Sequence, residues 1–165
     1  MNRKGFLLGE ETLKIVIAVI ALVFLIYFLT SLYFTNLNAE KIKQAKADVE
    51  RIVENADSLA EGESATQVLP NPEGWYLFGF TGEIKPNSCF GESCICVCDR
   101  VFDNPIRNLF SKWEERQSVQ CLKNGACANV ENLEPFDEIK IAKTKDKLTT
   151  ISIKKESGIF ISEEK

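Results

Sequence analysis

Histidine is absent from this sequence of 165 residues. Without an imidazole, the chain cannot build the Ser-His-Asp or Cys-His arrangements of hydrolytic enzymes, or a histidine-ligated metal site. A glycine-rich loop of the kind that binds phosphate is also missing. The carboxylates are scattered, and adjacent ones such as Glu114 and Glu115 do not converge on one substrate. These absences predict that the protein is not an enzyme and holds no cofactor.

An excess of positive charge is missing as well. The sequence has 20 Lys and Arg residues against 24 Asp and Glu residues, which gives a net charge of −4. A nucleic-acid-binding protein needs a basic face for the phosphates. We therefore predict that DNA and RNA are not among the partners.

Charge of either sign is missing from residues 15–34, which form a long apolar run. As a helix rising about 1.5 Å per residue, this run is long enough to cross a hydrocarbon core of about 30 Å. A cleaved secretory signal has a shorter apolar core followed by a small-x-small cleavage site, and neither feature is present. The run therefore predicts a transmembrane helix, with the membrane as the first partner.

Residues 3–10 read RKGFLLGE, and this stretch resembles the class III leader of type IV pilins and their archaeal relatives. The resemblance implies that a prepilin-type peptidase cuts after Gly5, so that the leader 1–5 is lost and Phe6 becomes the first residue. Glu10 is then the fifth residue of the mature chain, where the family carries a glutamate that faces the N-terminal amine of a neighbour. The resemblance also implies self-association through the N-terminal helix.

A plain signal anchor is the alternative interpretation. Glu11, Thr12 and Lys14 follow Glu10, whereas the pilin family usually continues with apolar residues. Glu10 and Lys14 have the i,i+4 spacing of an ordinary helical ion pair, which would lie at the headgroup level. Both interpretations place a basic and polar segment, residues 1–14, before one membrane span.

Basic residues do not decide the orientation of the span, because Arg3, Lys4 and Lys14 precede it and a similar number of lysines follow it. All six cysteines lie beyond the span. An even number of cysteines in a small domain behind a membrane segment is typical of disulfides in an oxidising compartment. We therefore expect a single-pass protein of the cell membrane, with a cytoplasmic N-terminus and an extracytoplasmic C-terminal domain.

Residues 35–60 carry apolar side chains every three or four positions, which predicts an amphipathic stalk helix that ends near Gly62. No proline occurs before Pro70, so this helix can continue from the span. After a polar stretch at 63–67, short apolar runs and alternating patterns predict strands. The strands expected are 75–80, 94–98, 118–122, 126–131, 136–142, 148–154 and 159–162. Asn124-Gly125 predicts a hairpin turn, and residues 105–113 a short helix.

The cysteines are Cys89, Cys94, Cys96, Cys98, Cys121 and Cys127. If residues 94–98 form a strand, its three cysteines share one face and need partners from elsewhere. Cys89 can reach Cys94 by closing the loop between them. A tight turn at Asn124-Gly125 would point Cys121 and Cys127 in opposite directions, which favours links from both to the 94–98 strand. Disulfides that staple a small domain are therefore the first interpretation.

Two rival roles for the cysteines stay open. Four to six thiolates are able to hold zinc or an iron-sulfur cluster, although the C-x2-C pairs typical of such sites are missing and we assign no metal ligand. Neighbouring thiols in Cys94-x-Cys96-x-Cys98 are also able to exchange disulfides. A redox or metal role is therefore the alternative to stapling.

The patterns together predict an α+β fold, in which a long N-terminal helix, transmembrane and then amphipathic, precedes a small antiparallel β domain with disulfides over residues 61–165. The aromatic strand with Trp75, Tyr76, Phe78 and Phe80 is more typical of a core than of a binding platform. The expected function is that of a membrane-anchored extracytoplasmic structural or interaction protein, either a pilin-like subunit or a pseudopilin-like surface protein. The alternative is a plain signal-anchored surface domain with a thiol-redox or metal-binding role.

Overall fold

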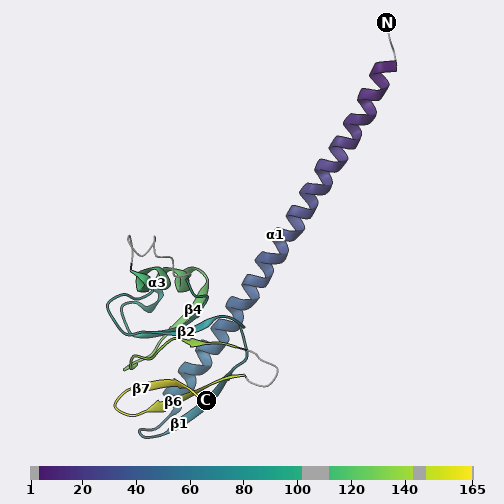
Figure 1. Ribbon diagram of the computed structural model, residues 1–165. Coiled ribbons are helices and arrows are strands. Elements are labelled where there is room, and N and C mark those ends of the chain that lie inside the picture. The colour runs from purple at the N-terminus through teal and green to yellow at the C-terminus, as the bar shows by residue number, and fades with distance from the viewer. Residues whose placement is uncertain (1–3, 102–111, 143–147, 165) are drawn as a thin grey trace. The chain divides into compact units, whose positions relative to one another are not determined.

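The computed structural model describes residues 4–101, 112–142 and 148–164, and for residues 4–11 it describes the backbone alone. The chain divides into two units, Met1–Ala39 and Glu40–Lys165. Helix α1, Lys4–Ser58, contributes to both units, and all the strands belong to the second (Figure 1). The predicted α+β fold is confirmed.

The first unit is helical over its described residues. Large apolar side chains such as Leu22 and Ile26 are exposed on this part of α1. The helix itself satisfies two hydroxyl groups, because Thr30 Oγ1 donates to the carbonyl oxygen of Ile26 (2.6 Å) and Thr35 Oγ1 to that of Ser31 (2.9 Å). By length and composition, this helix is able to cross a membrane.

The second unit begins with the C-terminal part of α1, which is amphipathic as predicted. The helix ends at Ser58, and Gly62 has a φ of +86° in the turn that follows. A left-handed φ of this kind is readily adopted by glycine, which has no Cβ. One stripe of the helix is buried, and it consists of Ala45, Val49, Ile52 and Ala56.

Two antiparallel sheets follow the helix and form the predicted antiparallel β domain. The first has the order β1-β6-β7, with β1 at Ser64–Leu69, β6 at Thr149–Lys155 and β7 at Ile159–Glu163. The second has the order β4-β3-β2-β5, with β4 at Gly125–Asn129, β3 at Cys94–Cys98, β2 at Tyr76–Phe80 and β5 at Ile139–Lys140.

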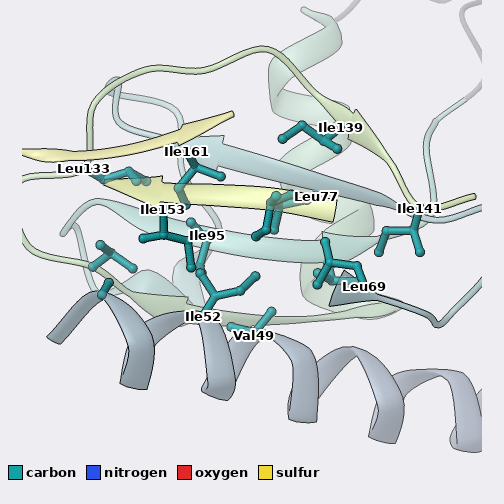
Figure 2. Close-up of a cluster of buried hydrophobic side chains, with 14 of the residues drawn as sticks. Val49, Ile52, Leu69, Leu77, Ile95, Leu133, Ile139, Ile141, Ile153 and Ile161 are labelled. Atoms are coloured by element: carbon teal, nitrogen blue, oxygen red, sulfur yellow. The ribbon is translucent and has the colours of Figure 1, made fainter. Parts of the chain in front are cut away.

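The main core lies between the buried stripe of α1 and both sheets. Figure 2 shows Val49 and Ile52 of α1 pointing toward side chains such as Leu77 and Ile153, one from each sheet. Ile151, Ile153, Ile159 and Ile161 are buried at alternating positions of β6 and β7, as expected for strands with one covered face. Burying each aliphatic side chain of this kind stabilises the fold by about 1.5–3 kcal/mol.

Strand β1 was not predicted, because its sequence was interpreted as a polar stretch. Two polar groups there have partners that only the fold supplies. Gln67 is buried, accepts a hydrogen bond from Asn55 Nδ2 (2.8 Å) and donates to the carbonyl oxygen of Asp48 (3.3 Å). A buried glutamine is tolerated when both ends of its amide are bonded. Strand β1 therefore contains Gln67, a polar residue whose sequence context is typical of a loop.

The predicted hairpin at Asn124-Gly125 is wrong. Residues 118–122 belong to helix α3, Trp113–Lys123, and only β4 on the other side of the turn is a strand. Asn124 caps the helix, since its backbone N–H donates to the carbonyl oxygen of Gln120 (2.8 Å). Gly125 then starts β4 so close to β3 that an added Cβ would lie 2.5 Å from Cys98 Cβ. Asn-Gly therefore joins a helix to a strand here.

The remaining predictions of secondary structure are confirmed in part. The strands expected at 75–80, 94–98, 148–154 and 159–162 correspond to β2, β3, β6 and β7. The strand expected at 136–142 is reduced to the short β5, Ile139–Lys140. Of the helix expected at 105–113, residues 105–111 lie outside the described part of the chain, and Trp113 is the first residue of α3.

Candidate functional site

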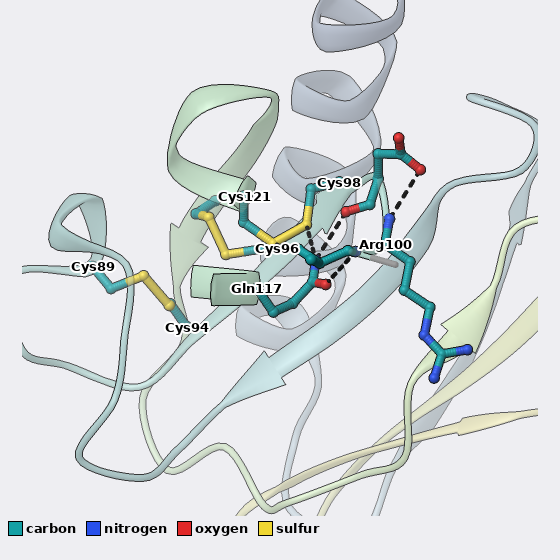
Figure 3. The surroundings of a disulfide bond; sticks show 10 residues. Cys89, Cys94, Cys96, Cys98, Arg100, Gln117 and Cys121 are labelled. Atoms are coloured by element: carbon teal, nitrogen blue, oxygen red, sulfur yellow. Dashed lines mark hydrogen bonds between the residues drawn. A yellow bond between two sulfur atoms is a disulfide. The ribbon is translucent and has the colours of Figure 1, made fainter. Parts of the chain in front are cut away.

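The cysteines form a row of disulfides along one face of β3. Side chains alternate along this strand, so Ile95 and Val97 enter the main core while the cysteines face the other way. The bonds are Cys89–Cys94, Cys96–Cys127 and Cys98–Cys121, with Cα–Cα distances of 5.9, 4.1 and 5.0 Å. Figure 3 shows this row beside α3. The predicted disulfides are confirmed.

The links from Cys121 and Cys127 to β3 are confirmed, but the hairpin that suggested them is wrong. Cys127 lies in β4 directly opposite Cys96 in the strand register. Cys121 reaches Cys98 from helix α3 instead of from a strand. The bond between Cys98 and Cys121 therefore ties α3 covalently to the sheet.

Three of the sulfurs also meet a geometric requirement for metal binding. The Sγ atoms of Cys89, Cys94 and Cys96 lie within 4.8 Å of one another, and all three residues are buried. A thiolate is the form of cysteine that binds metals, and a cysteine in a disulfide has no thiolate. All six cysteines are disulfide-bonded in this structure, so the row as it stands offers sulfur without charge.

Gln117 holds α3 against the end of β3 and was not predicted from the sequence. Its side chain is fully buried. Its Oε1 accepts from the backbone N–H of Val101 (2.8 Å), and its Nε2 donates to the carbonyl oxygen of Asp99 (2.9 Å) and contacts Cys98 Sγ (3.4 Å). Figure 3 shows this bridge. Nothing in the local pattern distinguishes Gln117 from the exposed polar residues of α3.

Arg100, just after β3, lies among aromatic rings and a carboxylate. Its guanidinium carbon is 5.7 Å from the ring centroid of Tyr76 and 6.0 Å from that of Trp113, which are cation–π distances. Its Nη2 lies 3.0 Å from Oε1 of Glu138. The Trp113 ring also lies 6.1 Å from the Phe78 ring. The Gln117 bridge holds the backbone on both sides of Arg100, so it also positions this cluster.

A hollow of about 790 Å³ opens beside this cluster, and we call it the aromatic hollow. Of the aromatic strand, Trp75 enters the main core, and Phe78 and Phe80 are buried at the hollow. Phe136 lies over Gly79, where an added Cβ would be 2.5 Å from its ring. The aromatic hollow is lined by Phe78, Phe80, Trp113, Phe136 and by charged groups of Glu83, Arg100, Lys112, Glu114, Asp137 and Glu138.

Two buried carboxylate oxygens have no hydrogen-bond partner in the described structure. One is Oε2 of Glu138 at the aromatic hollow, and the other is Oδ2 of Asp48 on the buried face of α1. Burial raises the pKa of Asp48 to about 6, because it penalises the charged form, while Arg51 opposes the shift. Asp48 is therefore a poorly satisfied acid inside the second unit.

Gly5, Phe6 and Glu10, the predicted residues of leader cleavage and assembly, lie near the N-terminal end of α1. Only their backbone is described, so their role stays a prediction. No model of a known protein family, no curated protein and no solved structure matches the chain. The functional argument therefore depends on the residues and their geometry.

Proposed function

We propose that the protein is a membrane-anchored extracytoplasmic structural or interaction protein of the pilin-like or pseudopilin-like kind. The observation that carries this proposal is the register of Gly5, Phe6 and Glu10 at the start of a helix that is apolar enough to span a membrane. Cleavage after Gly5 would create an ammonium group on Phe6. In hydrocarbon, the carboxylate of Glu10 and this ammonium of a neighbouring copy would offset each other's loss of hydration.

The second unit supports a structural role over a catalytic one. Its helix stripe is covered by two sheets, and its cysteines are joined in disulfides. Disulfides form and persist in oxidising compartments, which supports an extracytoplasmic position for residues 61–165 and a cytoplasmic N-terminus. Protease treatment of intact spheroplasts tests this orientation. Digestion of the second unit is the expected result, and full protection would contradict it.

The decisive experiment is the mass of the mature N-terminus. The full chain is produced in membranes together with a prepilin-type peptidase, and mass spectrometry is expected to find Phe6 as the first residue. Gly5→Val is expected to block cleavage, because the residue before the cut must be small. Gly9→Val is the matched control and should be cleaved normally. An intact N-terminus in the unaltered chain would remove the pilin-like proposal and leave the plain anchor.

Assembly through the N-terminal helix is tested with two differently tagged copies of the chain. Glu10→Ala is expected to abolish their co-purification from membranes, because the mature amine loses its counter-charge. Glu11→Ala, one residue later, is the control and should retain it. Equal co-purification of both variants would show that Glu10 has no assembly role.

The alternative function is a thiol-redox or metal-binding domain. It depends on the Sγ atoms of Cys89, Cys94 and Cys96, which lie within 4.8 Å of one another and would bind a metal only after reduction of their disulfides. Counting free thiols in the unfolded, non-reduced protein separates the two functions. A stapled structural domain has none, whereas a metal or redox domain isolated under the same conditions has several. Zinc titration of the reduced and the oxidised full chain then tests binding directly.

A further inference from the structure

Phe90, in the second unit, has an exposed aromatic ring and a backbone conformation that is unfavourable for a large side chain. Phe90 is 87% exposed, the largest exposed fraction among the exposed large apolar residues of the described chain. Its φ is +50°, in the left-handed region where glycine or asparagine is usual and a large side chain is uncommon. It caps the short 3-10 helix η1, Asn87–Cys89, a role that needs no aromatic ring.

The loop that presents Phe90 is constrained by a disulfide and by backbone hydrogen bonds. The Cys89–Cys94 disulfide closes it. The Phe90 N–H donates to the carbonyl oxygen of Asn87 (3.2 Å), just before this loop, and the Glu92 N–H inside the loop donates to that of Cys89 (2.9 Å). An aromatic side chain on a preorganised turn loses little entropy on binding and makes an efficient anchor of an interface.

A cation lies beside this ring in the same loop. Lys85 Nζ donates to the carbonyl oxygen of Gly91 (3.0 Å), the residue after Phe90. One hydrogen bond uses only one of the three ammonium protons, so the others are available to an acceptor. The loop therefore presents an apolar ring and a positive charge together.

The aromatic hollow has the complementary chemistry. Phe78 and Phe80 form apolar walls, and four carboxylates line it against the two cations of Arg100 and Lys112. Arg100 is already paired with Glu138 Oε1, so its charge is offset within the chain. The hollow thus combines apolar walls with an excess of negative charge, which suits a ring that arrives with a cation.

We propose that Phe90 of one copy inserts into the aromatic hollow of a second copy, with Lys85 facing the carboxylates there. A second copy fits better than a lipid surface, because Glu83 and Glu92 flank the loop and would be repelled by anionic headgroups. The hollow and the surface beside Phe90 share Gly82 and Glu83. Two copies are therefore able to exchange rings reciprocally about a twofold axis. This contact lies in the second unit and does not depend on the pilin-like proposal.

Photo-crosslinking of the full chain in detergent micelles tests the contact. Phe90 is replaced by the photoreactive benzoylphenylalanine, and the protein is mixed with an isotope-labelled copy so that links between chains are recognised by mass. The expected crosslinks join position 90 of one chain to 78–84, 112–114 or 136–138 of the other. Position 160 is the control, because Phe160 is an aromatic residue of β7 that is also exposed, at 38%. Equal yields from both positions, or links from 90 only to detergent or to other surfaces, would overturn the proposal.

Sedimentation of the same micelles gives an independent measurement. Phe90→Ser is expected to weaken self-association about 10- to 30-fold, the loss typical of an interface anchor, and Phe160→Ser to leave it unchanged. Glu138→Gln is expected to weaken it from the other side of the contact. The measurements are repeated with Glu10→Ala, so that a failure of assembly through the N-terminal helix is distinguished from a failure of this contact. If Phe90→Ser associates as strongly as the unaltered chain in both backgrounds, the contact does not exist.

Discussion

Helix α1 carries two kinds of apolar surface. In the first unit, apolar side chains such as Ile26 lie on every side of the helix and are exposed. In the second unit, apolar residues such as Ile52 keep to one stripe, which packs against the two sheets and is buried along its centre. The difference shows that two parts of one helix are suited to two different environments. A helix that is apolar on every side requires a lipid or protein environment, whereas a striped helix requires only one packed face.

The largest expected difference in the free energy of unfolding comes from truncating one apolar side chain on each of these two surfaces. Ile52→Ala is expected to lower the free energy of unfolding of the second unit by about 2–5 kcal/mol, because it leaves a cavity in a packed core. Ile26→Ala is expected to leave that free energy unchanged. Denaturant titration followed by tryptophan fluorescence in detergent measures both. Equal losses would mean that the two surfaces are not energetically distinct.

The three disulfides all lie in the second unit, so removing them should affect that unit and leave the first unchanged. In the chain-entropy model, a bond closing a loop of 23 residues, Cys98–Cys121, contributes about 3.4 kcal/mol, and one closing a loop of 5, Cys89–Cys94, about 2 kcal/mol. Replacing each pair with alanines should lower the denaturation midpoint in that order. Membrane insertion of the first unit, measured by alkaline extraction, should not change. The reverse order would show that native packing outweighs loop closure.

Asp48 interrupts the buried stripe, and its charge is expected to oppose folding at neutral pH. Its pKa is raised from 3.8 to about 6 by burial, so the folded state holds the proton more tightly than the unfolded state. The stabilising contribution is complete below pH 3.8 and is lost as the pH rises through 6. Asp48→Asn should therefore stabilise the second unit by about 3 kcal/mol at pH 7 and by little at pH 3.5.

Unfolding titrations at both pH values measure the effect of Asp48. Glu50→Gln is the matched control, because Glu50 is an exposed carboxylate on the same helix. A stabilisation by Asp48→Asn that does not change with pH would contradict the expected proton linkage.

The smallest expected effect lies on the exposed side of the striped segment. Lys46 and Glu50 form an i,i+4 ion pair at 3.7 Å in which both side chains are more than half exposed. Lys46→Ala should change the free energy of unfolding by no more than about 0.5 kcal/mol, and less at high salt. Unfolding titrations in low and high salt measure this. A larger loss would mean that the outer face of the helix is packed against another surface.

Much of the fold could be predicted because local patterns determine which face of an element is apolar. The alternation of Cys94, Cys96 and Cys98 with Ile95 and Val97 indicated a strand whose three cysteines share one face, and β3 has that form. Residues 118–122 show the limit of this reasoning. Their pattern fits a short strand as well as a helix, and in the structure they belong to α3, which the Cys98–Cys121 bond ties to the sheet.

The candidate sites differ in the same way. The disulfide row could be predicted because side chains on one strand face must find partners nearby. The aromatic hollow could not, because Arg100, Trp113 and Glu138 are distant in sequence and lie in different segments. Gln117 gave no signal, since a buried glutamine and an exposed one look alike until their hydrogen bonds are known.

Local patterns in the sequence are enough to predict the uninterrupted N-terminal helix, its change from apolar on every side to one apolar stripe, and the face that the cysteines of β3 share. These features depend on helical and strand periods, which are local. Contacts between distant segments account for the rest. The strands divide into two sheets, Cys121 comes from a helix, and Asp48 and Glu138 each bury an oxygen that has no partner among the described residues. The period of the hydrophobic pattern indicates which side of a helix or strand is apolar. The surface that covers this side depends on packing between residues far apart in the chain.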